Sequence, residues 1–423
     1  MKRFFGEWTT QLKSYNKNIQ LFLLASVLAN IGMGIFMVIY NYYIRELGYD
    51  DQMNGRIIAM QAMASAIALL PAGLLSDKFG RKKLIFIGAI FTATSLLLRA
   101  VLTADVTLLT TAFATGFFMA FIQVSSIPLL AENSTEKERV HLFSFNFALI
   151  MVANVIGNAL GGTLTDLFTF LFSISMLESV RITLIIASFF FFMALLPVLK
   201  LREELKKREQ KTGASSLGKL FTTHRSSLKW IGLFAIANLL IGFGSGLVIP
   251  YLNIYFSDRF EISNSLVGII LSLGQAMTAV AFMIGPSVVK RYGEVKAVVM
   301  LQIASLPFLL LTAYTETLWL AVIGFLFRQA LMNAGNPIQM ALMMRTVDDS
   351  MKGLANSVGQ MIFQLGWAVM GPVSTSIVIV YGAYYGYAYV FTITSVLYLI
   401  GSSYFYFVFR RLDKKNKNVE EVA

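Results

Sequence analysis

The sequence predicts an all-α membrane protein whose helices cross the bilayer twelve times in two pseudo-symmetric six-helix bundles. Of the 423 residues, 57% are hydrophobic and 14% are charged, whereas soluble globular chains have about 25% charged residues. Apolar stretches of the roughly 20 residues that cross a hydrocarbon core recur along the whole chain. Helices are expected because backbone amides must be satisfied inside lipid and the alternation typical of barrel strands is missing.

The apolar stretches also predict how the chain is organised. The expected spans are 19–44, 54–76, 84–102, 107–131, 141–166, 180–200, 228–256, 265–289, 297–313, 318–345, 353–381 and 386–409. We therefore expect an N-terminal six-helix half at 1–200, a cytoplasmic linker at 201–227, a C-terminal six-helix half at 228–409 and a cytoplasmic tail at 410–423.

Basic residues predict the orientation of these spans. Of the 35 Lys and Arg residues, 29 fall on the side that holds both termini, including all 19 Lys. Cytoplasmic loops carry such a positive excess, so both termini are expected in the cytoplasm. The first apolar run is too long for a signal peptide, and we expect it to insert the protein into the plasma membrane.

Composition also argues against several classes of protein. The chain has no Cys and two His residues, which leaves little material for disulfides, thiol chemistry or metal sites, and we expect no cofactor and no metal. No nucleophile and base cluster visibly and no phosphate-binding loop occurs, so an enzyme is not expected. The net charge of +12 lies in short runs between spans, which argues against nucleic acid as a partner.

The two halves are internal repeats. Gly55 and Gly80 match Gly268 and Gly293 at an offset of 213 residues, while the charges that flank the second glycine diverge, which we interpret as decay of the second copy. Two further matches are Gly32 and Gly34 with Gly242 and Gly244, and Gly157 with Gly371. Parallel six-helix repeats are a plan of secondary transporters, which bind substrate between the halves near the bilayer midplane.

The segment 73–83 (GLLSDKFGRKK) resembles the loop between the second and third helices of the major facilitator superfamily. The matching residues are Gly73, Asp77, Lys78, Gly80, Arg81 and Lys82, and the twelve-span layout extends the resemblance over the whole chain. The resemblance implies a latch that closes the cytoplasmic side. Its partners would be the 353–356 backbone for Asp77 and Glu132 for Arg81, with Arg139 completing the pattern. Alternatively, these charges only fix topology.

A second family element, from the fifth helix of proton-coupled drug exporters, is matched in part. Ala153, Gly157, Gly161 and Gly162 fit the pattern, but Asn158 stands at its proline position, and Gly371 and Pro372 supply a Gly-Pro in the eleventh span. We expect these residues to act in helix packing or as a hinge. Small residues at this spacing also simply let helices approach closely.

Arg328 is the one ionisable residue that the predicted spans place deep in the membrane. Intramembrane charge is costly and suggests function, so Arg328 is a candidate to bind a carboxylate or phosphate or to respond to a proton, unless it is structural. Met332, Asn336 and Gln339 follow at helical spacing and predict a cavity-lining stripe. Further candidates for substrate binding or coupling are Asn30, Asn41, Gln123, Asn238, Gln275, Gln360 and Gln364.

These observations favour a monomeric secondary transporter that exports a drug, amphiphile or organic anion in exchange for protons. No carboxylate lies in the middle of a span, with Asp166 nearest, so the coupling residue stays open. An uptake permease or uniporter for a sugar, carboxylate or other metabolite is the alternative. A non-transporting receptor or lipid-handling protein with the same fold is a third hypothesis. The expected partners are a small-molecule substrate, a coupling ion and the bilayer.

Overall fold

The computed structural model describes residues 15–202, 224–348 and 351–420, and every regular element in these residues is helical. The elements are α2 (Lys17–Glu46), α3 (Asp51–Phe79), α4 (Arg81–Val101), α5 (Asp105–Glu132), α6 (Glu136–Phe172), α7 (Met176–Leu199), α9 (Arg225–Val248), the 3-10 turn η1 (Ile249–Tyr251), α10 (Leu252–Phe260), α11 (Asn264–Tyr292), α12 (Glu294–Tyr314), α13 (Leu318–Thr346) and α14 (Lys352–Glu420).

The helices give the twelve predicted crossings. Among the described residues, 11 helical segments are long and apolar enough to span a membrane, and α9, η1 and α10 together form one of them. The last segment, α14, contains two helices that meet at Gly382, whose φ of +75° interrupts the helical backbone. The eleventh and twelfth predicted spans are therefore the two parts of α14.

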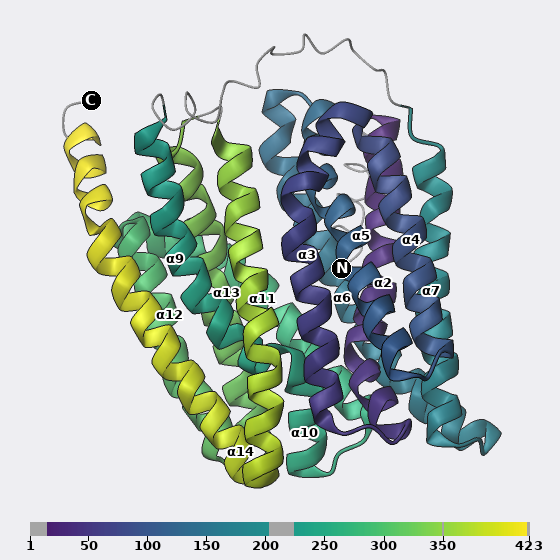
Figure 1. Cartoon of the computed structure of the whole chain (residues 1–423). Helices are drawn as coiled ribbons and strands as arrows, with labels where there is room; N and C mark the ends of the chain where they lie inside the picture. The colour runs from purple at the N-terminus through teal and green to yellow at the C-terminus, as the bar shows by residue number, and fades with distance from the viewer. Residues whose placement is uncertain (1–14, 203–223, 349–350, 421–423) are drawn as a thin grey trace, which may run out of the picture.

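The helices pack in two groups of six crossings (Figure 1). Helices α2–α7 pack against one another, as do α9–α14, while α3 against α14 and α6 against α11 form the main contacts between the groups. The group ends nearest Leu199 and Arg225 are called the linker end here. The opposite ends, where α2 and α10 finish, are called the far end. Residues 203–223, most of the predicted linker, lie outside the described residues.

Helix caps repeat between the groups at the predicted offset of 213 residues. The Asp50 side chain caps α3 by accepting from the Met53 amide, and the Ser263 side chain caps α11 by accepting from the Leu266 amide. Gly80 and Gly293 end the same two helices with φ values of +97° and +88°. A positive φ favours glycine, so the repeat preserves the residue that this turn requires.

The other two predicted repeat matches are displaced. The Tyr43 hydroxyl donates to the Ala100 carbonyl and the Tyr255 hydroxyl donates to the Thr312 carbonyl, so the first and seventh crossings correspond at an offset of 212. Gly32 and Gly34 therefore match Gly244 and Gly246, rather than Gly242 and Gly244.

The fifth and eleventh crossings also shift by one residue. A Cβ atom placed on Gly268 would lie 2.5 Å from the Asn158 carbonyl oxygen, and one placed on Gly55 would lie 3.2 Å from the Gly371 carbonyl oxygen. Gly371 thus corresponds to Asn158, and the predicted match with Gly157 is wrong by one position. The Gly-Pro of the eleventh crossing is consequently out of register with the fifth-helix pattern.

Candidate functional site at the interface of the two helix groups

A reciprocal pair of asparagines joins the two groups in the far half of the bundle. The Asn41 amide donates to the Pro250 carbonyl at 2.8 Å and to Asn253 Oδ1 at 2.9 Å. The Asn253 amide in turn donates to the Val38 carbonyl at 2.7 Å. Both asparagines are buried, at 6% and 2% exposure. Because Val38 matches Pro250 and Asn41 matches Asn253 at the offset of 212, the two bonds are related by the repeat symmetry.

An ion-pair cluster closes the far end beyond the asparagines. The Arg45 guanidinium donates to the Asp51 carboxylate at 2.6 and 2.7 Å and to the Asp258 carboxylate at 2.5 and 2.7 Å. Asp51 belongs to the same group as Arg45, whereas Asp258 lies on α10 of the other group. The Tyr387 hydroxyl lies 3.4 Å from Asp258. One cation therefore holds two carboxylates, and one of these bonds crosses the interface.

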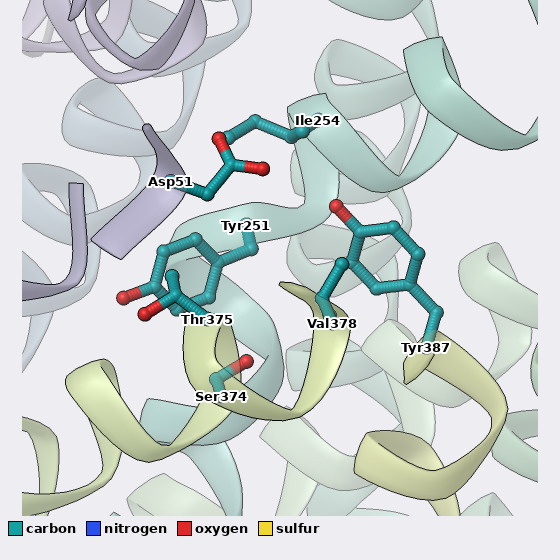
Figure 2. Close-up of a pocket in the computed structure, with 7 residues that line it drawn as sticks. All are labelled: Asp51, Tyr251, Ile254, Ser374, Thr375, Val378 and Tyr387. Atoms are coloured by element: carbon teal, nitrogen blue, oxygen red, sulfur yellow. The ribbon is translucent and has the colours of Figure 1, made fainter. Parts of the chain in front are cut away.

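A small cavity lies beside this cluster (Figure 2). Its volume is about 10 Å³, and its lining residues are Asp51, Tyr251, Ile254, Ser374, Thr375, Val378 and Tyr387. A cavity of roughly 10–15 Å³ holds about one water molecule. It is too small for an organic solute, so it belongs to the closed far end and is not a substrate site.

Helices α6 and α11 form a second seam at the far end. The Asp166 carboxylate accepts a 2.7 Å hydrogen bond from the Ser265 amide in the first turn of α11. A carboxylate at a helix N-terminus is favoured by the helix dipole. A Cβ atom on Gly162 would collide with the Asn264 backbone. Asp166 thus contacts the opposite group, and Gly162 of the fifth-helix element lies where α6 and α11 approach closely.

The first crossing packs against the other predicted glycines of α6. A Cβ atom on Gly157 would collide with the Ile31 carbonyl, and one on Gly161 would lie 3.1 Å from the Ile35 carbonyl. Gly371 lies near Tyr251, whose hydroxyl donates to the Gly371 carbonyl at 2.9 Å. Backbone contact at these positions explains why small residues occupy them.

At the linker end, the predicted latch residues bind within their own group. Arg81 Nε lies 3.4 Å from Glu132 Oε1, and Arg81 Nη1 donates to the Ser76 hydroxyl at 2.7 Å. Lys82 donates to the Leu199 and Leu201 carbonyls. Gly73 has open space around its Cβ position, and Lys78 is exposed above the Phe79 ring. The Asp77 and Arg139 side chains lie outside the described residues.

The polar contacts define which end of the interface is closed. The hydrogen bonds between Ser272 and Val155 and between the two asparagines, and the ion pair of Arg45 with Asp258, join the groups in the far half. Figure 1 shows α10 lying between the groups at this end. The structure therefore describes a state whose far end is closed.

Arg328 is buried inside the second group rather than at the interface. Its guanidinium donates to Gln329 Oε1 at 2.9 Å and to the Tyr398 hydroxyl at 2.8 Å, and the residue is 3% exposed. Met332 is buried in the same core, where the Ser305 hydroxyl lies 3.7 Å from its sulfur.

The remainder of the predicted Arg328 stripe points elsewhere. Asn336 is exposed and donates to Asn333, while Gln339 donates to the Asn238 amide oxygen of α9 at 3.0 Å. Successive turns of α13 therefore present their side chains to different neighbours. The described contacts do not gather the four residues at one place, and their role in lining a cavity stays a prediction.

The remaining predicted polar residues have varied surroundings. The Asn30 amide donates to the Ser26 carbonyl of its own helix at 2.8 Å. Gln123 and Gln360 are exposed, and Gln275 and Gln364 are half-buried. The described contacts do not gather these five residues at one point.

Arg99 is a further buried charge, two residues before the end of α4. It is 3% exposed, its Nη1 donates to Gln61 Oε1 at 2.8 Å, and its guanidinium carbon lies 4.0 Å from the centre of the Tyr40 ring. Arg328 has a similar environment, 5.5 Å from the Tyr398 ring centre. Each group thus buries one guanidinium against a tyrosine and a glutamine.

The described residues contain no group of three or more His, Asp or Glu side chains that could hold a metal ion. The described contacts between the groups are side-chain amides, an ion pair and close backbone approaches.

Comparisons with known proteins agree with this architecture. A family model described as Major Facilitator Superfamily matches residues 22–236 and 234–423. The chain is 23% identical over 406 residues to the class H tetracycline resistance protein of Pasteurella multocida, which covers 92% of this chain and 96% of that protein. It is 24% identical over 151 residues to the quinolone resistance protein NorA of Staphylococcus aureus, covering 36% and 39% of the two chains.

Solved structures show the same fold. The nucleoside transporter NupG aligns with a TM-score of 0.71 at 18% identity, covering 93% of this chain and 99% of that chain. A bacterial homolog to the human lysosomal transporter Spinster, in an inward-facing and unoccupied conformation, aligns with a TM-score of 0.73 at 14% identity, covering 93% and 96%. At these identities the likeness extends to the fold alone.

Proposed function

The chain belongs to the major facilitator superfamily, and from this premise we propose that it is a proton-coupled exporter of a small organic amphiphile or organic anion. The observation that carries a transport cycle is the far-end closure, in which Asn41, Asn253, Arg45 and Asp258 join two helix groups that each pack internally. Rocking the groups about their interface alternates the end to which a central site is open.

Export is favoured over uptake by two observations. The class H tetracycline resistance protein resembles this chain over nearly its full length, and the 73–83 segment has the intact loop pattern. NupG, a nucleoside transporter by name, supports the alternative of an uptake permease for a metabolite. The missing fifth-helix proline, replaced by Asn158, also favours that alternative.

We place the linker end in the cytoplasm, because the side that holds the linker and both termini carries 29 of the 35 Lys and Arg residues. The far end then faces outward, and we propose that the protein is a monomer of the plasma membrane, closed here on its outward side. In the opposite state the 73–83 loop would close the cytoplasmic side, with Asp77 approaching the 353–356 backbone. Arg81 and Glu132 would position this loop.

Two of the buried guanidiniums, those of Arg99 and Arg328, favour an anionic substrate. Arg99 and Arg328 have no carboxylate partner among the described contacts, and each therefore places an uncompensated positive charge inside the membrane-spanning bundle. Such charges attract anions and are retained for function by default. A solute with a carboxylate or phosphate would lower the electrostatic cost of burying the Arg99 and Arg328 guanidiniums.

The test is transport in membrane vesicles turned inside out, energised by a proton gradient. An anionic and a cationic fluorescent dye are supplied separately to the cytoplasmic side. Uptake of the anionic dye that stops when an ionophore removes the proton gradient is the expected result. Uptake of neither dye, together with uptake of nucleosides or sugars by intact cells, would replace export with the permease alternative.

A further inference from the structure

A glutamine that binds a buried arginine lies at the same place in both groups, but on opposite helices. In the first group a Cβ atom on Gly116 of α5 would collide with the Gln61 carbonyl oxygen of α3. In the second group a Cβ atom on Gly274 of α11 would lie 3.7 Å from Gln329 Cγ on α13. At the offset of 213 residues Gln61 matches Gly274. Gly116 likewise matches Gln329, so glutamine and glycine have exchanged places between the repeats.

The arginines fix the direction in which each side-chain amide points. Arg99 Nη1 donates to Gln61 Oε1 at 2.8 Å. Arg328 Nη1 donates to Gln329 Oε1 at 2.9 Å. A guanidinium has donors and no acceptor, so only the amide oxygen can face it. Each Nε2 group is therefore turned away from its arginine. Among the described contacts neither Nε2 group has an acceptor, and neither is fully buried.

The arginines themselves are enclosed by the protein. Arg99 and Arg328 are each 3% exposed, and each keeps a buried Nε–H group without a partner among the described residues. A solute that approaches this place meets the amide rather than the guanidinium. Because the amide oxygen lies on the cation, the amide presents the positive end of its dipole outward, and the low dielectric strengthens this arrangement. The exposed end of each amide thus attracts an anion and repels a cation.

The two amides lie at similar depth in the membrane. Helices α3 and α13 both begin at the far end, and Gln61 follows Asp51 by ten residues while Gln329 follows Leu318 by eleven. At a rise of about 1.5 Å per residue, these positions are about 15 Å and about 17 Å from the far end. That depth is near the middle of a hydrocarbon core of about 30 Å. Transporters built from such repeats bind their substrates at this level.

We infer that Gln61 and Gln329 determine the charge specificity of the transporter, with their Nε2 groups donating to the carboxylate, sulfonate or phosphate of the solute. Arg99 and Arg328 are positioning residues, which orient and polarise these amides without touching the solute. This assignment rests on the proposed transport of an anionic solute. It explains how two enclosed guanidiniums select a solute that they do not contact.

The test replaces each glutamine in two ways. Gln61→Glu and Gln329→Glu keep an acceptor for the arginine, but they remove the Nε2 donor and cancel the buried positive charge. Gln61→Met and Gln329→Met remove the donor and keep the charge. Gln52→Glu adds the same negative charge at an exposed position in the first turn of α3 and is the matched control. Fluorescence anisotropy of the purified proteins measures the dissociation constants of three anionic dyes, which carry a carboxylate, a sulfonate and a phosphate. Melting temperatures show that each variant is folded.

For the dye that wild type binds most tightly, we expect binding at least ten-fold weaker in each glutamate variant and at least three-fold weaker in each methionine variant. Gln52→Glu should bind as wild type does. A glutamine that only holds its arginine could be replaced by glutamate without loss, so unchanged binding in the glutamate variants would overturn the assignment. Unchanged binding in the methionine variants would also overturn it, because the anion would then contact the guanidinium.

Two further outcomes are distinguishable from these. If a glutamate variant does not fold, the methionine variant at the same position decides the result. If wild type binds none of the three dyes, the anionic solute of the proposed function is refuted, and the assignment fails with it. Dye binding by wild type that both kinds of variant retain refutes the assignment alone.

Discussion

Asn41 and Asn253 donate side-chain hydrogen bonds to backbone carbonyls of each other's helix group, at positions related by the internal repeat. The two groups therefore bind each other through equivalent asparagines, one from each group. Because both amides are buried, the bonds form in a low-dielectric environment, where an unmade partner is costly. This pair is positioned to set the free energy of far-end closure.

Replacing either Asn41 or Asn253 with alanine should favour opening of the far end. Loss of a buried hydrogen-bond partner costs about 1–3 kcal/mol, which corresponds to roughly a 5- to 150-fold rise in the open population. The labelling rate of a Thr375→Cys reporter by a membrane-impermeant thiol reagent measures this population, because Thr375 is buried beside the far-end cavity and the chain has no other cysteine. The double variant should fall short of the summed effects, because the two residues share a bond. Asn30→Ala, whose amide binds its own helix, is the control and should label at the parent rate.

Arg45 forms one ion pair within its own group and another across the interface, and substitutions can distinguish their effects. Asp258→Asn should weaken closure, since it removes the carboxylate that Arg45 reaches across the interface, by about 1 kcal/mol for a partly exposed pair. Asp51→Asn removes the partner in the same group and should open the far end less. Equal labelling of the two variants would show that the crossing bond does not control closure.

Gly162→Ala should prevent full far-end closure. The added methyl group would collide with the Asn264 backbone, which cannot move aside without separating α6 from α11. We expect faster labelling at the far end and transport reduced by at least ten-fold. Gly232→Ala, at a helical position with open space around it, is the matched control and should leave both properties unchanged.

The pH dependence of stability should include a contribution from the end of α13. The hydrogen bond from His224 lowers the pKa of the Asp348 carboxyl below its ordinary value, helped by the Ser227 hydroxyl. A lowered folded-state pKa stabilises the protein above about pH 4 and loses that effect as the pH falls through the lowered value. The melting temperature of wild type should exceed that of Asp348→Asn at neutral pH, and the two should converge on acidification. A constant difference down to pH 3 would contradict this assignment.

The helical fold was predictable because crossing a membrane demands long apolar runs, and these runs survive in the sequence without any knowledge of packing. The break between the last two crossings was also predictable, because the expected spans end at 381 and resume at 386, on either side of Gly382. The repeat register was recoverable at Gly80 and Gly293, where a positive φ constrains the residue. The predicted register was wrong at Gly32, because only tertiary contacts determine which glycine of the second half corresponds to it.

The interface was less accessible to sequence reasoning, because its partners are far apart in the chain. Arg99 lies two residues from the end of α4, so its position alone suggests the membrane surface, and only packing turns its guanidinium onto Tyr40. The contact between Arg45 and Asp258 was predictable from the sequence. The two residues have opposite charges and lie 213 residues apart, at equivalent ends of two crossings.

Ligand binding can distinguish two roles for Arg328, which are binding the substrate and holding α13 to α14. Arg328→Ala should lower the melting temperature without any ligand, because it leaves the buried Tyr398 hydroxyl and Gln329 without a partner, at a cost of about 1–3 kcal/mol. Tyr398→Phe keeps the charge and removes only one of these bonds, which makes it the matched control. A ligand that binds the folded state raises the melting temperature by mass action. If anionic ligands stabilise wild type and Tyr398→Phe but not Arg328→Ala, the guanidinium charge binds the substrate. If all three proteins respond equally, Arg328 holds α13 to α14 and the substrate charge is read elsewhere, with Arg99 as the next residue to replace.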